Sequence, residues 1–163
     1  MANPAKNNVL RLLEARKVAY QAFTYSDEIH SAEGAAEAMG VPAEQVYKTL
    51  VVLRERGRPI LVMVPGGHEL DLRRLAKALG EKKLRMATQR EAEALTGLLV
   101  GGISALALLH KGFEVYIDAS ARRWSQIHVS AGQRGLNVRL AVVDLVKLTG
   151  ARIVEAVDED TET

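Results

Sequence analysis

The chain contains no cysteine and few aromatic residues, which make up 4% of its 163 positions. The absence of cysteine excludes disulfide bonds, thiolate metal ligands and a cysteine nucleophile. No apolar run approaches the roughly 20 residues that a membrane-spanning helix needs. The first 20 residues also lack the apolar core and the small-residue cleavage site of a secretory signal. These absences lead us to expect a cytoplasmic protein that does not associate with membranes.

Several widespread functional motifs are also absent. The sequence has no GxGxxG, GxxxxGK[S/T], HExxH, CxxC or GxSxG pattern, so it offers no standard signature of a dinucleotide site, a P-loop, a zinc protease or a serine hydrolase. The four histidines, at positions 30, 68, 110 and 128, are far apart and show no ligand-like spacing. We expect them in loops or on the surface, and we expect neither a bound metal nor a cofactor.

The charges are unevenly distributed along the chain. The net charge is +2, but five of the 20 acidic residues lie in the last nine positions, so residues 1–154 hold 15 acidic against 22 basic residues. An excess of seven positive charges is compatible with a polyanionic ligand such as RNA, although many domains with a similar charge bind no nucleic acid. We expect a single domain over residues 1–163, in which 156–163 form a frayed acidic tail.

The hydrophobic pattern predicts helices and short strands in mixed order, without a repeated βαβ unit. A compact α+β domain is therefore favoured over a doubly wound sheet. Two β-rich runs on either side of Gly57-Arg58-Pro59 predict a β-hairpin. Predicted helices cover 5–16, 31–40, 71–79, 88–95 and 144–148, and predicted strands cover 19–25, 46–56, 60–65, 115–118, 127–130 and 137–143.

Two glycine-rich segments, 97–104 (GLLVGGIS) and 130–136 (SAGQRGL), are candidates for a binding site. Glycine permits unusual backbone angles and a close approach by a ligand. Backbone N–H groups in such turns can hold an anion or an oxyanion. The same glycines would also be found in ordinary tight turns, and the residues alone leave both interpretations open.

A third candidate is Lys48, which lies within the apolar run VYKTLVV. Strand alternation places it on the opposite face from Tyr47 and Thr49. A lysine that faces a cleft could hold a phosphate or a carbonyl oxygen, because a buried ammonium needs a partner. A lysine on an edge strand that faces water is equally compatible with this pattern.

Together these segments resemble the YbaK/EbsC family of aminoacyl-tRNA editing deacylases. VYKTLVV, GLLVGGIS and SAGQRGL follow the family's order and spacing, and FTYSDE (23–28) and residues 70–88 are similar to further family segments. The resemblance covers roughly residues 5–155. It implies a compact mixed α/β domain around a curved, mostly antiparallel sheet, which is shared with the editing domain of bacterial-type prolyl-tRNA synthetase.

The resemblance also implies roles for particular residues. Lys48 matches the essential lysine, which would hold the 3′-terminal adenosine or its phosphate, and Gly101 and Gly102 match the loop around the aminoacyl carbonyl. The implied substrate-binding residues are Tyr25, Thr49, Ser104, Ser130, Arg134 and Asn137.

The implied reaction is the release of a mischarged amino acid from tRNA, in the first place cysteine from Cys-tRNA(Pro). The family uses no side-chain nucleophile. Either the substrate thiol attacks its own carbonyl and leaves as a thiolactone, or a water molecule attacks. The implied partners are the aminoacyl-tRNA acceptor end and prolyl-tRNA synthetase, with no role for DNA. A deacylase for alanine or serine remains an alternative.

The sequence departs from the family pattern around the first glycine loop. The family usually continues Ser-Pro-x-Gly, whereas here Ser104 is followed by Ala105-Leu106-Ala107. Leu98 replaces an aromatic residue and Ala131 a glycine, while Asn137 stands where the YbaK branch often has aspartate or serine. We therefore expect a looser or differently shaped loop. These departures support a second alternative, a catalytically silent RNA- or nucleotide-binding module of the same fold.

Overall fold

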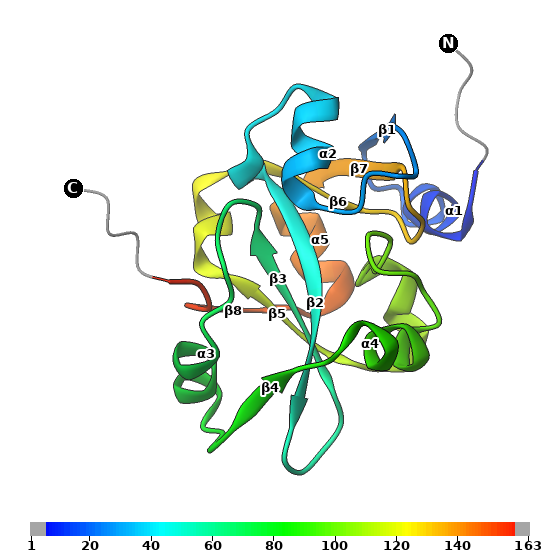
Figure 1. The fold of residues 1–163 in the computed structure, drawn as a ribbon. Coiled ribbons are helices and arrows are strands. Elements are labelled where there is room, and N and C mark those ends of the chain that lie inside the picture. The colour runs from blue at the N-terminus through cyan, green and yellow to red at the C-terminus, as the bar shows by residue number, and fades with distance from the viewer. Residues whose placement is uncertain (1–5, 159–163) are drawn as a thin grey trace.

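The computed structural model describes residues 6–158. Its framework is an eight-stranded sheet in the order β1-β7-β6-β2-β3-β5-β8, with β4 paired to β2 outside this path (Figure 1). The strands are β1 (Tyr20–Thr24), β2 (Val46–Arg54), β3 (Ile60–Pro65), β4 (Leu84–Met86), β5 (Glu114–Asp118), β6 (Gln126–Ser130), β7 (Leu136–Ala141) and β8 (Arg152–Val154).

The sheet is mixed but mostly antiparallel, as the family resemblance predicted. The pairs β1·β7, β6·β7, β2·β3 and β2·β4 are antiparallel, whereas β2·β6, β3·β5 and β5·β8 are parallel. The predicted hairpin is confirmed, because β2 and β3 pair from Tyr47↔Pro65 to Val52↔Ile60. The three parallel pairs join strands that are far apart in the sequence, and the hydrophobic pattern did not predict them.

The helices lie close to the predicted ranges, and capping residues mark the start of several of them. The Ser31 and Asp71 side chains accept bonds from the first-turn N–H groups of their helices, and Thr88 forms a capping box with Glu91. The predicted strand over 137–143 ends earlier than expected, because α5 starts at Val142. The helices are α1 (Asn8–Ala15), α2 (Ala32–Met39), α3 (Leu72–Leu79), α4 (Gln89–Thr96) and α5 (Val142–Thr149), with 3₁₀ turns η1 (Ala43–Gln45), η2 (Leu106–Lys111) and η3 (Ala119–Arg123).

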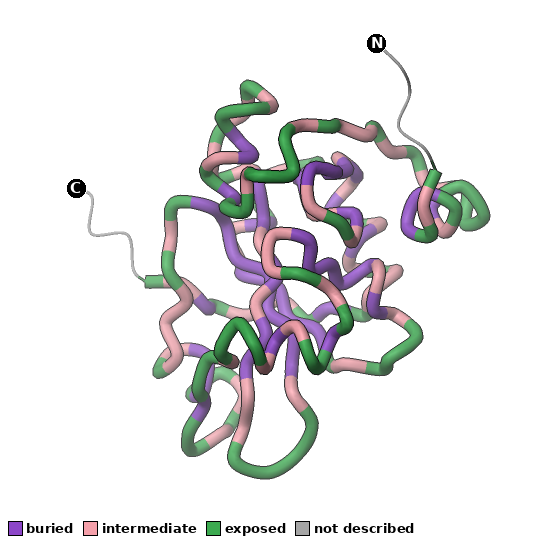
Figure 2. The backbone as a smooth tube through the Cα atoms, turned by 45° about the vertical axis from the view of Figure 1, so that its right-hand side comes forward, coloured by how far each residue is buried: buried purple, intermediate pink, exposed green. Residues whose placement is uncertain are grey.

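The sheet buries apolar side chains on both faces, and its strands form the buried centre of the molecule (Figure 2). One face packs with α1, α5 and η2 into the largest core cluster, which includes Tyr47 and Val51 of β2. On the other face, Val46 packs with α2 and Val52 packs with α3. Alternation along β2 therefore places Lys48 on the face of α2 and α3, opposite Tyr47, as predicted.

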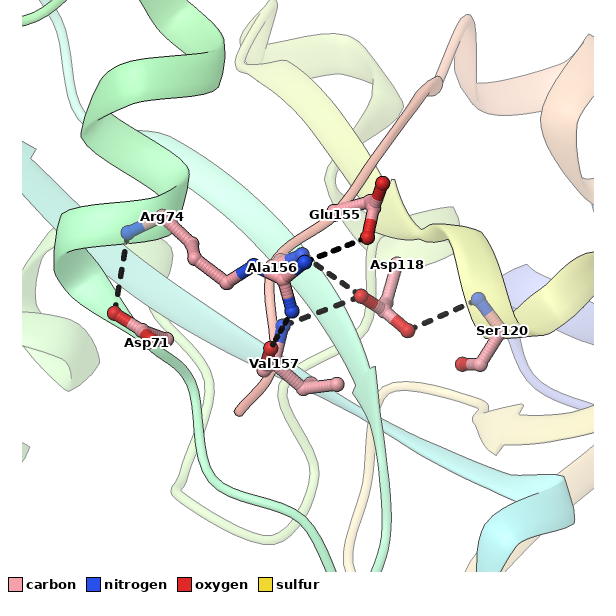
Figure 3. Close-up of polar contacts among 7 residues, drawn as sticks. All are labelled: Asp71, Arg74, Asp118, Ser120, Glu155, Ala156 and Val157. Atoms are coloured by element: carbon pink, nitrogen blue, oxygen red, sulfur yellow. Dashed lines mark hydrogen bonds and ion pairs between the residues drawn. The ribbon is translucent and has the colours of Figure 1, made fainter. Parts of the chain in front are cut away.

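The segment that follows β8 is anchored by a buried carboxylate. Asp118 Oδ1 accepts hydrogen bonds from the N–H groups of Ala156 (2.8 Å) and Val157 (3.2 Å), and Oδ2 accepts one from Ser120 N (3.0 Å; Figure 3). Arg74 donates to the Val157 carbonyl at 2.9 Å. Residues 156–158 are therefore held against the domain, whereas 159–163 of the predicted acidic tail lie outside the described residues.

None of the described helices is long and apolar enough to cross a membrane.

Candidate functional site

The candidate site is built on an interruption in the sheet. One edge of β2 pairs with β3 from Tyr47 to Val52. Along the other edge, β6 pairs only with Val46 and Tyr47, and β4 pairs only from Val52 to Arg54. Within residues 6–158, no strand pairs with this second edge between those two segments. The Val51 carbonyl also accepts a hydrogen bond from Ala87 N on this edge, so residues 48–50 form a short open stretch of strand edge inside the molecule.

A cavity of about 380 Å³ lies over this open edge. Its walls come from the start of α2, the end of β4, the start of α4, the 100–103 loop and the ends of β6 and β1. Most of its surface is apolar, as is usual for small-molecule sites. The residues that line it are Tyr25, Ile29–Glu33, Ala35, Val46–Val51, Met86, Ala87, Gln89, Ala92, Val100, Gly101, Ile103, Ser130 and Asn137.

The cavity brings together most of the side chains that the sequence nominated. Six of the nine predicted site residues line it, and they come from five separate segments of the chain. The six are Tyr25, Lys48, Thr49, Gly101, Ser130 and Asn137. The other three, Gly102, Ser104 and Arg134, lie next to the cavity but outside its lining.

Gly101 and Gly102 shape a tight turn at the mouth of the cavity. Gly102 N donates to Leu99 O at 2.8 Å, and Gly101 in the third position of this turn has φ +96°, which favours glycine. A Cβ on Gly101 would also lie 3.0 Å from His30 Cα. The Gly102 N–H is already used within the turn, so the Gly101 N–H is the glycine donor available to a ligand.

Gly102 and Arg134 join the two glycine-rich segments. A Cβ on Gly102 would lie 2.9 Å from backbone atoms of Gln133 and Arg134, so only glycine permits this approach. Arg134 Nε donates to Val100 O at 2.7 Å. The two segments therefore form one connected rim, and the Arg134 side chain is used to hold it.

Ser104 and the residues after it belong to the core beneath the site. Ser104 is 1% exposed, and its hydroxyl accepts a bond from Ala107 N at 3.2 Å. Ala105 has φ −62°, close to the angle that proline fixes, so the backbone angle at this position is one that a proline could also adopt. Of the positions where the sequence departs from the family pattern, Leu98, Ala105, Ala107 and Ala131 do not line the cavity, whereas Asn137 does.

A row of polar side chains forms one end of the cavity. Asn137 is 3% exposed and lies opposite Ser130 in the β6·β7 pair. Burial raises the pKa of Tyr25, while the neighbouring Asn137 side chain acts in the opposite direction. The polar groups at this end are therefore partly desolvated, which strengthens their interactions with a bound ligand.

His128 lies behind Asn137, and the expectation of a loop or surface position was wrong for this residue. It is completely buried in β6, and its ring meets that of Phe23 edge-on at 5.1 Å. Burial lowers its pKa to about 4, with a further contribution from the positive charge of Arg139. Neither ring nitrogen has a hydrogen-bond partner of normal geometry. The alternation of Ile127, His128 and Val129 places the histidine on the face opposite the two apolar residues, so no local signal in the sequence indicated that this second face is also covered.

The apolar walls of the cavity were not predicted from the sequence. Ala35 of α2, Ala92 of α4 and Ile103 line it, but alanine and isoleucine at helical or strand spacing are typical of any core. Besides Tyr25 and Tyr47, the ionisable residues that line the cavity are Lys48 and the exposed residues His30 and Glu33. Among residues 6–158, no three histidine or acidic side chains are arranged to hold a metal ion.

Comparison with known proteins identifies the family. The sequence profile of the aminoacyl-tRNA editing domain matches residues 26–148. This chain belongs to that family. The editing domain is 38% identical over 152 residues to an Enterococcus faecalis protein named "Putative Cys-tRNA(Pro)/Cys-tRNA(Cys) deacylase EbsC", covering 92% of each chain.

Two further relatives connect the editing domain with prolyl-tRNA synthetases. It is 33% identical over 93 residues to the proline–tRNA ligase of Nitratidesulfovibrio vulgaris, covering 57% of this chain and 16% of the ligase. A solved structure titled "Crystal structure of a putative trans-editing enzyme for prolyl tRNA synthetase" superimposes with a TM-score of 0.80 at 26% identity, covering 94% of this chain and 99% of that one. The predicted family and fold are confirmed.

Proposed function

We propose that this editing domain is a trans-acting deacylase that cleaves a mischarged small amino acid from the 3′ end of tRNA, with Cys-tRNA(Pro) as the first candidate substrate. The observation that carries the proposal is a largely apolar cavity that holds Lys48 together with the Gly101 turn. Such a cavity suits a small side chain next to a charged nucleotide. The name of the Enterococcus faecalis relative supports the choice of cysteine.

The polar groups of the cavity favour cleavage without an enzyme nucleophile. The hydroxyls of Ser31 and Ser130 each accept a bond from a backbone N–H, and neither is hydrogen-bonded to a histidine or a carboxylate. A serine nucleophile needs such a base. Water or the thiol of the substrate would therefore attack the ester carbonyl, and the ribose oxygen would leave with a proton. The Gly101 N–H would stabilise the oxyanion, a contribution of about 3–4 kcal/mol.

Lys48 would hold the terminal adenosine or its phosphate in this arrangement. It lies on the face of β2 opposite Tyr47 and lines the cavity. A lysine ammonium binds a phosphate as a point charge. Fixing the nucleotide in this way would place the ester against the Gly101 turn, and positioning of this kind can lower a barrier by about 7–11 kcal/mol in favourable cases.

A basic surface next to the cavity supports an RNA partner. Residues 72–90 contain seven basic side chains and one acidic side chain. This segment runs through α3 and β4 and reaches Met86 and Gln89, which line the cavity. Six of the seven basic residues are exposed, namely Arg73, Lys77, Lys82, Lys83, Arg85 and Arg90. An acceptor stem lying along this surface would bring its 3′ end to the cavity, and prolyl-tRNA synthetase would supply further tRNA selection.

Deacylation of a small panel tests the proposal. The panel contains Cys-tRNA(Pro), Ala-tRNA(Pro), a Ser-tRNA and Pro-tRNA(Pro), with the natural protein, Lys48→Ala and Lys147→Ala. Lys147 is an exposed lysine on α5, outside the cavity lining, so its variant controls for loss of one charge. We expect rapid loss of one mischarged species, abolished by Lys48→Ala at an unchanged Tm and unaffected by Lys147→Ala.

Two other results would change the conclusion. Full activity of a folded Lys48→Ala protein would refute the role of Lys48. If no species were deacylated, even with prolyl-tRNA synthetase added, the silent binding module would become the better interpretation. Loss of Ala-tRNA(Pro) or of the Ser-tRNA alone would identify alanine or serine as the amino acid removed.

A further inference from the structure

The polar groups of the Thr49 backbone point into the cavity. Gly66 N donates to Val46 O at 2.8 Å, so the Val46 carbonyl faces β3. In an antiparallel ladder, alternate residues turn both N–H and C=O toward the same neighbour. Lys48 and Leu50 therefore bond to β3, whereas Thr49 faces the opposite edge.

Two independent contacts confirm this alternation. Pro65, which has no N–H to donate, lies opposite Tyr47, where the ladder requires no bond. On the other edge, Val51 O accepts a hydrogen bond from Ala87 N at 3.0 Å. Tyr47 and Val51 thus face the second edge of β2, and Thr49 between them does the same.

Thr49 is the residue on that edge to which no neighbouring strand is paired. Strand β6 pairs with β2 as far as Tyr47, and the pairing of β2 with β4 begins at Val52. Of the hydrogen bonds that the structure shows outside its regular elements, none involves the N–H or C=O of Thr49. The residue is only 8% exposed, and buried peptide groups almost always have a partner. The N–H and the C=O of Thr49 are therefore a donor and an acceptor that a ligand in the cavity can bind.

The opening has room for about one residue of an added strand. Tyr47 and Val51 are four residues apart, which corresponds to about 13 Å along a strand. An α-amino acid ester carries a donor, its ammonium, and an acceptor, its carbonyl, on either side of one Cα. This is the pattern by which a residue exchanges two hydrogen bonds with its partner in an antiparallel pair.

We propose that the aminoacyl group of the substrate docks on Thr49 as a one-residue antiparallel strand. Its ammonium donates to Thr49 C=O, and its ester carbonyl accepts from Thr49 N–H. This inference rests on the proposed function and adds the group that recognises the amino acid. It is a small form of the strand addition by which sheet edges bind peptides.

The docked position also determines which part of the substrate lies on each face of the sheet. Paired residues in a ladder direct their side chains to the same face, so the substrate side chain lies on the face of Thr49. That side of the cavity is bounded by Ala92 and Ile103, both members of the main core cluster. Lys48 is left on the other face for the nucleotide. The Thr49 N–H remains on the carbonyl oxygen as negative charge develops there.

Amide hydrogen exchange measured by NMR tests the proposal. The probe is an RNA minihelix that carries alanine on its 3′ end through an amide, which keeps the donor and the acceptor but resists cleavage. The matched control carries a propanoyl group, which lacks the ammonium. We expect the Thr49 amide of the free protein to exchange about 100-fold faster than those of Lys48 and Leu50, and to slow about tenfold or more when the alanyl minihelix is bound. The propanoyl minihelix should bind more weakly.

Each contrary result has a definite meaning. A Thr49 amide that is as protected as Leu50 in the free protein would overturn the proposal, because the edge would already be satisfied. So would saturation with the alanyl minihelix that leaves Thr49 exchange unchanged. Equal affinity for the alanyl and propanoyl minihelices would exclude recognition of the ammonium. If neither minihelix bound and no aminoacyl-tRNA were deacylated, the proposed function itself would fall, whereas failure to bind by an active deacylase would overturn this inference alone.

Discussion

Replacing Asp118 should destabilise the protein strongly without altering the cavity. Its carboxylate is 3% exposed and accepts three backbone N–H bonds, two from the segment after β8 and one from Ser120. Asp118→Ala leaves all three donors without an acceptor. Asp118 does not line the candidate site, so the change should act on stability and not on catalysis.

The size of the effect follows from the burial of the three donors. Ala156 is completely buried, so its N–H would lose the full benefit of a partner, about 1–3 kcal/mol. Val157 and Ser120 are partly exposed, and water can replace part of each bond, which leaves about 0.5–1.5 kcal/mol for each. Asp118→Ala should therefore lower the free energy of unfolding by about 2–6 kcal/mol. Asp118→Asn keeps the oxygen that serves Ala156 and Val157, and should lower it by about 1–2 kcal/mol.

Urea unfolding of the natural protein, Asp118→Ala and Asp118→Asn measures both values, with deacylation at low temperature as the control for the site. The order alanine worse than asparagine is the critical result. Equal destabilisation by the two variants would show that the lost charge matters and that the hydrogen bonds do not. A change below about 1 kcal/mol for alanine would refute the reasoning, since no rearrangement should satisfy three N–H groups at once.

The two remaining predictions concern a buried histidine and the basic surface. Burial lowers the pKa of His128 from 6.5 to about 4. Between these two pH values the unfolded chain binds a proton at His128 that the folded protein does not bind. The free energy of unfolding should therefore have its full value above pH 6.5 and fall by up to about 3 kcal/mol toward pH 4. His128→Phe should flatten this part of the profile in urea unfolding, and an unchanged profile would contradict the assignment. Changing Lys82 and Lys83 to Glu should reduce the slope of log binding constant against log salt concentration for tRNA by about 1–2. The same change in charge at Arg122 and Lys147 should leave this slope unaltered. Equal effects of the two double variants would show that only the net charge of the protein matters.

The sequence predicted local features of the fold better than distant pairings. The β2–β3 hairpin depends on the turn at Gly57-Arg58-Pro59 and two adjacent apolar runs, all within 20 residues. The helix caps at Ser31 and Thr88 likewise depend on neighbours a few positions away. By contrast, the parallel pairing of β2 with β6 joins Val46 to His128, and no local pattern encodes a contact over that distance.

The site shows the same division. Lys48 and Gly101 were nominated because their residue types are unusual in their surroundings. The alanines of the cavity wall, Ala35 and Ala92, could not be distinguished from core residues, because their role depends on which segments the fold brings together. The open edge at Thr49 was equally hidden, since it is defined by where β6 and β4 stop.

The close approach at Gly102 limits how this pocket can change in evolution or by design. Gly102 touches the backbone of the opposite turn, and Arg134 binds the Val100 carbonyl, so the two loops cannot shift independently. A larger opening would require the contact of Gly102 and the hydrogen bond of Arg134 to be lost together. No single substitution removes both. Adjusting the accepted amino acid one residue at a time is therefore easiest on the walls, at positions such as Ala92 and Ile103. The rim is the conservative part of the site, and the walls are the adaptable part.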